Sequence, residues 1–283
     1  MPKQEYLIRK MTRQEVDLAV QWAAKEGWNP GIHDADCFYK TDPNGFFIGL
    51  LDNKPISCIS AVAYDNSFGF IGLYIVKSEY RGKGYGIQIW NKAIEYLKTQ
   101  NIGLDGVLAA QKSYKKSGFK LYYRNIRYQG KSLKNNYQYP DIVKLSLIPF
   151  QQIKAYDNNL FPAPRPQFLK CWLKQPESYA FGALKNNQLV GYSVIRRCQQ
   201  GYKIGPLFAD DKNIAEKLFN TMNACLTKGT EIFLDIPEIN PAAVALAKNH
   251  HLTIVFETAR MYTKKQPKIN LNKVFGVTTF ELG

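Results

Sequence analysis

Residues 75–86 read Ile75-Val76-Lys77-Ser78-Glu79-Tyr80-Arg81-Gly82-Lys83-Gly84-Tyr85-Gly86, and this stretch lies between an apolar segment and an amphipathic one. Its three glycines allow positive φ angles and remove side chains that would block a ligand, so successive N–H groups can converge on an anion. A helix that begins there adds unpaired N–H groups and the positive end of its dipole. The stretch therefore suits a pyrophosphate group, with Arg81 and Lys83 as fixed charges beside it.

The residues around this loop predict an α/β unit. Residues 68–76 read as a buried strand, and residues 87–97 carry apolar side chains at helical spacing. Thr12, with Glu15 three residues later, is a typical start of a helix, here over 9–27. The other predicted elements are hairpin strands at 46–51 and 56–64, a strand at 106–108, a helix at 111–117 and a strand at 120–128.

The second half of the chain repeats this order. Residues 181–188 align with residues 47–54 at a constant offset of 134, and each segment ends in a hairpin turn. We interpret the chain as two diverged copies of one unit, domains at 1–134 and 141–283 joined near 135–141; one large α/β domain is the alternative. The predicted elements are strands at 142–147, 179–184, 189–196, 202–209 and 232–236, and helices at 149–160, 165–173, 211–227 and 241–249.

The spacing of the glycine-rich loop is specific. It is neither G-x-x-x-x-G-K-[ST] nor G-x-G-x-x-G. It resembles the acetyl-CoA pyrophosphate loop of the GCN5-related N-acetyltransferases (GNAT), whose signature Gln/Arg-x-x-Gly-x-Gly/Ala is matched by Arg81, Gly84 and Gly86. The resemblance implies an α/β (α+β) fold of two tandem GNAT-like domains, each a mixed, mostly antiparallel sheet flanked by helices. It also implies acetyl-CoA as the cosubstrate; from the few histidines and scattered cysteines we expect no metal.

The resemblance further implies how the cofactor is held. In this family the strand before the loop splays from its neighbour, so that backbone groups near Tyr74 and Val76 can bond the pantetheine and the thioester oxygen. An N–H group there would stabilise the tetrahedral oxyanion by about 3 kcal/mol. The implied cofactor-binding residues are Tyr74, Val76, Arg81, Gly82, Lys83, Gly84, Tyr85 and Gly86.

A second match to the family's sequence pattern indicates a candidate for the general acid. The family places a Tyr four residues before a Gly-Phe pair, and Tyr114 stands four residues before Gly118-Phe119. Tyr114 is then the expected catalytic general acid, because a departing CoA thiolate needs a proton and a phenol with a pKa near 10 can donate it. A packing role as a half-buried core aromatic is the alternative for this side chain.

The acceptor site is predicted from the loop at 27–31. An aromatic beside an amide in a Gly-Pro loop is costly to expose without use, so Trp28 and Asn29 are candidate substrate contacts. Asp34 follows the loop and is a third candidate. The general base is left open among the polar residues of this region and one at a strand end: His33, Asp34, Asp36 and Asp65.

The second copy lacks the glycine loop. After its corresponding strand it reads Gly205-Pro206-Leu207-Phe208-Ala209-Asp210-Asp211-Lys212, and aspartates at a helix start cap the helix and repel a pyrophosphate. We therefore expect no ordinary CoA binding there. The whole layout resembles a bacterial two-domain GNAT subgroup in which a degenerate domain follows an active one, and the closing Phe280-Glu281-Leu282-Gly283 is part of that resemblance.

The amino-acid composition restricts the class of protein, its ligands and its compartment. The 283 residues are 45% hydrophobic, enough for a core, and their net charge of +15 suits an anionic ligand such as CoA. The longest strongly apolar stretch is far shorter than the roughly 20 residues that span a bilayer. The charged N-terminus and five scattered cysteines predict a cytoplasmic protein with reduced thiols. Three histidines without a Cys-x-x-Cys pattern do not favour zinc.

These observations favour an N-acetyltransferase that passes an acetyl group directly from acetyl-CoA to a primary amine on a small molecule or protein. The active site is expected in the first domain. A noncatalytic acyl-CoA sensor or scaffold, whose second domain binds protein or nucleic acid, is the rival function. Nucleic acid is not the expected partner, because the sequence has no RNA-binding motif. The acceptor and the oligomeric state are left open.

Overall fold

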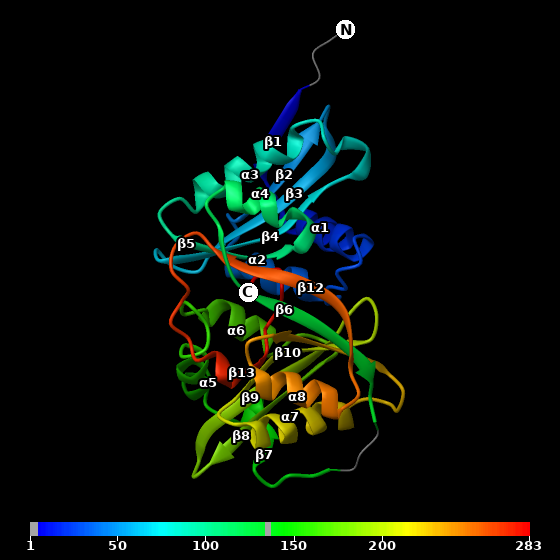
Figure 1. The fold of residues 1–283 in the computed structure, drawn as a ribbon, viewed down its shortest axis with the longest axis vertical. Helices are drawn as coiled ribbons and strands as arrows, with labels where there is room; N and C mark the ends of the chain where they lie inside the picture. Colours follow the sequence, from blue (N-terminus) through cyan, green and yellow to red (C-terminus); the bar gives the residue numbers. More distant parts are fainter. Residues whose placement is uncertain (1–4, 134–136) are drawn as a thin grey trace.

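The computed structural model describes residues 5–133 and 137–283 (Figure 1). In the first half, short helices and 3-10 turns separate six strands. The elements in chain order are β1 (Tyr6–Lys10), α1 (Arg13–Lys25), α2 (Asp34–Thr41), β2 (Phe46–Leu51), β3 (Lys54–Ala63), β4 (Phe68–Val76), α3 (Tyr85–Tyr96), β5 (Asn101–Val107), α4 (Gln111–Lys116) and β6 (Lys120–Lys131).

The second half follows the same plan and adds a short last strand. Its elements are β7 (Ile142–Lys144), α5 (Phe150–Asp157), α6 (Pro166–Trp172), β8 (Ser178–Lys185), β9 (Gln188–Arg197), β10 (Tyr202–Ala209), α7 (Lys212–Ala224), β11 (Glu231–Pro237), α8 (Pro241–Asn249), β12 (Thr253–Tyr262) and β13 (Val274–Gly276). Among the described residues no helix is long and apolar enough to cross a membrane.

All these strands belong to one continuous sheet. Its order is β1-β2-β3-β4-β5-β12-β6-β11-β10-β9-β8-β7, with β13 paired to β10 outside this path. Most neighbours are antiparallel, whereas β4–β5 and β10–β11 are parallel. The predicted fold class is confirmed as a mixed, mostly antiparallel sheet flanked by helices, and the predicted sheets of the two halves are joined into one.

The halves exchange their last long strands. β12 of the second half pairs with β5 of the first, Thr258–Tyr262 against Gly103–Val107. In return, β6 of the first half pairs with β11 of the second, Asn125–Lys131 against Glu231–Pro237. β6 and β12 also pair with each other, and both cross the middle of the molecule in Figure 1.

This exchange bears on the predicted domain boundary. Strand β6 precedes the predicted link near 135–141 in the chain, yet it lies between two strands of the second half. Residues 134–136 of that link lie outside the described residues. A division at 1–134 and 141–283 therefore stays a proposal about sequence repeats, because each half completes the sheet of the other.

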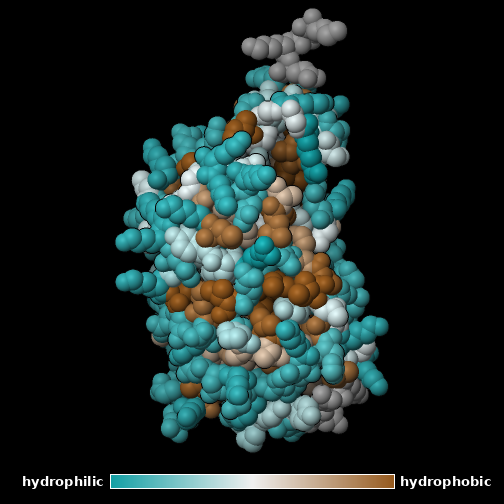
Figure 2. All heavy atoms as spheres, viewed as in Figure 1, coloured by the Kyte–Doolittle hydropathy of each residue, from teal (hydrophilic) through white to brown (hydrophobic). Residues whose placement is uncertain are grey.

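Helices cover both faces of the sheet. Ile89, Trp90 and Ala93 of α3 pack on one face of the first half against β2, β3 and β5. On the other face, α1 and α2 pack in one cluster with Phe168 and Trp172 of α6, so this cluster joins the two halves. On the face of Figure 2, apolar residues gather at the height at which β6 and β12 cross in Figure 1.

Several element predictions were wrong at their edges. The helix expected over 9–27 begins only at Arg13, because Tyr6–Lys10 pairs with β2 as a strand. The predicted start signal is nevertheless confirmed, since Thr12 and Glu15 form a reciprocal capping box. Helix α2 and strands β12 and β13 were not predicted.

The expectation of five reduced cysteines was wrong. Cys37 on α2 and Cys171 on α6 form a disulfide, with their Cα atoms 5.3 Å apart. They are 134 residues apart in the chain, which is the repeat offset, so they occupy equivalent positions of the two copies. Packing of α2 against α6 brings them together, and sequence distance hides that contact.

The double variant Cys37→Ser/Cys171→Ser is expected to lose about 2–4 kcal/mol of unfolding free energy, because the bond restricts a long loop in the unfolded chain. Urea denaturation under oxidising conditions measures this loss. Cys225→Ser, which removes a free and partly exposed thiol, is the matched control. Equal midpoints for the double variant and the wild type would contradict the prediction.

Candidate active site

A gap opens between β4 and β5. The two strands pair only from Phe68–Ile71 to Asn101–Leu104, and beyond that point β5 continues beside β12. At the opening, Leu73 has a φ of +46°, an uncommon backbone conformation for a branched residue that turns β4 away. The predicted splay of the strand before the glycine loop is therefore confirmed.

The glycine-rich loop follows the splayed strand β4 and leads into α3. After a 3-10 turn at Ser78–Tyr80, Gly82 and Gly84 have φ angles of +74° and +84°, and a Cβ on either would meet nothing within 4 Å. The backbone N–H groups of Gly82, Lys83 and Gly84 donate to no group among residues 5–133 and 137–283. The first turn of α3 carries no acidic residue. The loop thus presents open donors and a positive helix end.

The other predicted cofactor residues surround the loop. Gly86 lets α3 approach β4, since a Cβ there would lie 2.7 Å from the Tyr74 hydroxyl oxygen. The Tyr85 ring packs 4.8 Å from that of Tyr6, and Lys83 lies over the Tyr80 ring, 5.6 Å from its centroid.

Arg81 has two protein partners in this structure. Its Nε donates to the Val76 carbonyl oxygen at 2.7 Å, and its guanidinium also pairs with Glu26. These contacts link the start of the loop to the end of β4 and to the residue that ends α1.

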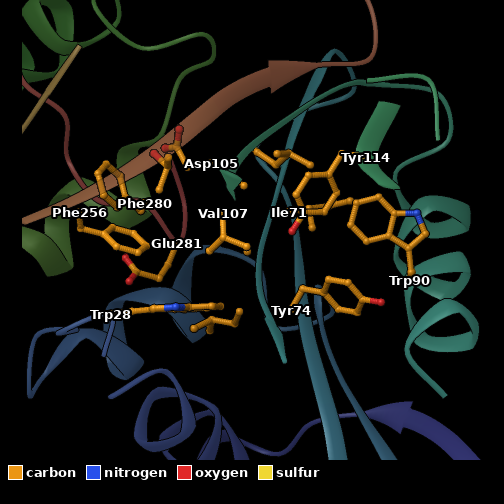
Figure 3. Close-up of a pocket in the computed structure, with 15 residues that line it drawn as sticks. Trp28, Ile71, Tyr74, Trp90, Asp105, Val107, Tyr114, Phe256, Phe280 and Glu281 are labelled. Atoms are coloured by element: carbon orange, nitrogen blue, oxygen red, sulfur yellow. The ribbon is translucent and has the colours of Figure 1, made fainter. Parts of the chain in front are cut away.

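A cavity of about 70 Å³ lies at the mouth of the splayed strands (Figure 3). Its first-half walls come from β4, β5, α3 and α4, and its second-half walls from β12 and the segment after β13. Figure 3 shows Tyr114, Trp90 and Tyr74 at one end, and Trp28, Phe256, Phe280 and Glu281 at the other. The cavity is therefore apolar, with a phenol and a carboxylate at opposite ends.

Tyr114 lies in this wall as the sequence predicted for an acid. Its ring packs 5.4 Å from Trp90, and the side chain is buried. Burial, with a smaller contribution from Tyr74, raises the pKa of Tyr114 to about 12. Gly106 makes room for the ring, because a Cβ there would collide with it. The phenol consequently stays protonated at neutral pH.

Of the three residues predicted to contact the acceptor, one lines the cavity and two do not. Trp28 lines the cavity. Asn29 does not: its side chain bonds the backbone of Gln200, donating at 3.0 Å and accepting at 2.8 Å. Asp34 does not either: it is fully buried and binds Arg196 through both oxygens, at 2.8 and 3.1 Å. Asn29 and Asp34 join the two halves.

The other residues considered as general bases also lie elsewhere. His33 contacts Glu177, Asp36 pairs with Arg13, and Asp65 accepts from backbone N–H groups of its own turn. None of them lines the cavity. The polar cavity residues that sequence reasoning missed are Asp105, Thr258 and Glu281. The only sequence feature that singled out Glu281 was its place in the closing motif, Phe280-Glu281-Leu282-Gly283.

In the described part of the second half, 137–283, the corresponding opening is occupied by protein. β10 and β11 pair only through Tyr202–Ile204 and Ile232–Leu234, and the opening beyond is filled by β13. The Val277 N–H continues this filling by donating to the Asp235 carbonyl oxygen at 2.8 Å.

The segment of the second half that corresponds to the glycine-rich loop is shorter, and the helix after it is capped. β4 and α3 begin 17 residues apart (Phe68 and Tyr85), whereas β10 and α7 begin ten apart (Tyr202 and Lys212). Asp211 caps α7, as predicted, by accepting from the N–H groups of Asn213 and Ile214. The N-terminal donors of α7 are therefore used internally.

Comparison with known families agrees with this geometry. Residues 13–119 match the model described as "Acetyltransferase (GNAT) family", and residues 153–276 match a second model, "Acetyltransferase (GNAT) domain". The chain belongs to the GNAT family and carries two GNAT domains in tandem. It is therefore an acyltransferase-family protein in both halves.

Several individual proteins are similar to this chain over nearly its whole length. The holothin acyltransferase of Pseudoalteromonas sp. (strain SANK 73390) is 28% identical over 99% of this chain and 95% of its own length. A putative acetyltransferase from Pyrococcus horikoshii shares the fold with a TM-score of 0.84 at 22% identity, covering 100% of this chain and 98% of that one. A tandem GNAT protein from the clavulanic acid biosynthesis pathway has a TM-score of 0.65 at 10% identity, covering 93% and 100%.

Proposed function

We propose that this protein is an N-acetyltransferase whose active site lies between β4, β5 and α3 of the first half. The observation that carries the proposal is the combination of splayed strands and a buried tyrosine at one cavity with a glycine loop of open donors between β4 and α3, two elements that line this cavity. The described part of the second half has neither an open gap between strands nor open loop donors, because β13 fills its gap and Asp211 caps its helix α7.

The residues present fit acetyl-CoA. The open N–H groups at Gly82–Gly84 and the α3 N-terminus would hold the pyrophosphate. Near Tyr74 and Val76, β4 still pairs with β3 but has lost β5 as a neighbour, so its β5-side edge can offer backbone groups to the pantetheine and to the thioester oxygen. When bound there, acetyl-CoA supplies the activated acetyl group. Backbone donors aimed at the oxyanion would contribute about 3 kcal/mol to the transition state.

Within this proposal Tyr114 is the acid and Trp28 a wall of the acceptor site. A phenol with a raised pKa is fully protonated at pH 7 and can donate to the departing sulfur. The acceptor end of the cavity is walled by Trp28, Phe256 and Phe280, which suits a primary amine on a flat, largely apolar body. Holothin is the first acceptor to test, in view of the relative named for it.

The variant Gly84→Ala is expected to weaken CoA binding by about 5- to 30-fold, because an L-residue in the left-handed region costs about 1–2 kcal/mol. Calorimetric titration with CoA measures the affinity. Gly229→Ala is the matched control: Gly229 has the same φ of +84°, an equally open surrounding and a place in the second half. Equal losses of affinity in both variants would contradict the assignment of the site.

Acyl transfer itself is tested by thiol release from acetyl-CoA with holothin, benzylamine, spermidine or a lysine-containing peptide as acceptor. The proposal expects release that depends on one of these amines and yields its acetylated product by mass spectrometry. CoA binding without transfer to any amine would favour the noncatalytic sensor function instead.

A further inference from the structure

The segment after β13 passes from the second half into the active-site cavity. It leaves the filled cleft at Val277 and runs so close to β4 that a Cβ on Gly72 would collide with the Glu281 carbonyl oxygen. The Tyr64 hydroxyl donates to the Leu282 carbonyl oxygen at 2.7 Å and fixes the segment there. Phe280 and Glu281 are thereby held in the wall of the first-half site.

Two carboxylates line the cavity, and they differ in their partners. Asp105 receives hydrogen bonds at 2.8 and 2.6 Å from Arg260 and a third at 2.8 Å from Asn125, so its charge is neutralised. Glu281 receives one side-chain hydrogen bond, from the Thr279 hydroxyl to Oε2. Its Oε1 accepts from no group among the described residues. Glu281 is therefore the cavity carboxylate with a free acceptor atom.

The charged groups that surround Glu281 are engaged with other partners. Arg127 of β6 binds Asp235 and the Trp28 carbonyl oxygen, and Arg196 of β9 binds Asp34. Lys203 of β10 donates to the Asn29 carbonyl oxygen at 2.8 Å. These three buried cations are close enough to Glu281 to interact with its charge, but none of them donates a hydrogen bond to it. They bind neighbouring carboxylates and carbonyl oxygens, so the Glu281 carboxylate keeps an oxygen that can accept a hydrogen bond from a ligand.

We propose that Glu281 is the general base for the acceptor amine, supplied by the second half to the active site of the first. The inference rests on the proposed function. Glu281 lies at the end of the cavity opposite Tyr114, beside Trp28 and Phe280 (Figure 3). The free oxygen of this carboxylate can accept a hydrogen bond from an amine that arrives as an ammonium ion.

The acceptor enters as an ammonium ion, R–NH₃⁺. Glu281 Oε1 takes one ammonium proton, and the freed lone pair forms the C–N bond to the thioester carbonyl carbon while the C=O π electrons move onto the oxygen, from which they return when the C–S bond breaks. The C–S bond breaks, and its electron pair stays on sulfur, which receives the phenol proton of Tyr114. The surplus proton of the new amide nitrogen returns to the Tyr114 phenolate through water. Glu281 releases its proton to solvent, and both residues are restored.

The test uses Glu281→Gln in the full-length chain, with the most active amine of the panel above as acceptor. The expected result at pH 7 is a 10²–10⁴-fold loss of kcat/KM, with CoA affinity and melting temperature unchanged. Glu257→Gln is the matched control, because Glu257 on β12 is partly exposed, pairs with Arg124 and lies outside the cavity. It is expected to keep wild-type activity.

The pH profile separates a base from a merely structural residue. Without the base, only acceptor that is already deprotonated reacts, so the deficit of Glu281→Gln grows about tenfold per pH unit below the pKa of the amine and closes above it. An equal deficit at every pH, or no deficit, would overturn the inference while leaving the proposed function intact. Wild-type protein that transfers to no amine would overturn both.

Discussion

The Tyr114→Phe variant is expected to transfer acetyl groups about 10²–10⁴ times more slowly than the wild type, with unchanged affinity for CoA. The variant keeps the ring that packs on Trp90 and removes only the hydroxyl. The thiolate then leaves without a positioned proton donor. Thiol release under saturating acetyl-CoA measures the rate, and calorimetry with CoA measures the binding.

The pH dependence of the wild-type rate provides a second check on Tyr114. Because burial raises the pKa of this phenol to about 12, it is protonated throughout the neutral and mildly alkaline range. The rate should therefore show no loss attributable to Tyr114 up to about pH 10. Tyr128→Phe, which removes the hydroxyl of a buried tyrosine outside the cavity, is the control and should leave the rate unchanged. A Tyr114→Phe enzyme as fast as the wild type would remove Tyr114 from the mechanism.

Replacing Arg196 by Met is expected to lower the free energy of unfolding by about 3–5 kcal/mol, since it leaves the Asp34 carboxylate buried without its partner. Asp34 and Arg196 come from different halves, and the exposed fractions of their side chains are 0% and 1%. Urea denaturation measures the loss. Arg197→Met changes the exposed neighbour on the same strand and should shift stability by no more than about 0.5 kcal/mol.

The same variants decide the role of Asp34. If Asp34 only joins the halves, Asp34→Asn combined with Arg196→Met should recover part of the lost stability, because no uncompensated charge then remains. If Asp34 also contacts the acceptor, as the sequence suggested, Asp34→Asn would in addition raise KM for the acceptor. The kinetics of these variants therefore separate the two roles.

The first-half fold could be predicted because its signals are local. The glycine loop, the strand before it and the amphipathic helix after it lie within 68–97, and Tyr114 is found by its spacing from Gly118-Phe119. The exchange of β6 and β12 could not be predicted, because it depends on pairing between segments more than a hundred residues apart. β12 also lacks a strict alternation of buried and exposed residues, since its second half is buried on both faces.

The acceptor end of the site was harder to predict for the same reason. Asn29 and Asp34 are polar residues after a Gly-Pro loop, a pattern equally suited to a ligand and to a distant backbone partner. The partners, Gln200 and Arg196, lie in the other half. Glu281 shows the converse case: it is far from the first domain in sequence, and a segment that passes through the degenerate cleft brings it to the cavity.

The strand exchange has a consequence for biosynthesis. As the polypeptide emerges from the ribosome, the central sheet of the first half lacks the neighbour of β5 until residue 262 has been translated. At typical elongation rates that interval is on the order of ten seconds, during which β5 has an open edge. Cotranslational maturation of the N-terminal half therefore has to wait for the half that follows it, and neither gene segment expressed alone encodes a finished sheet.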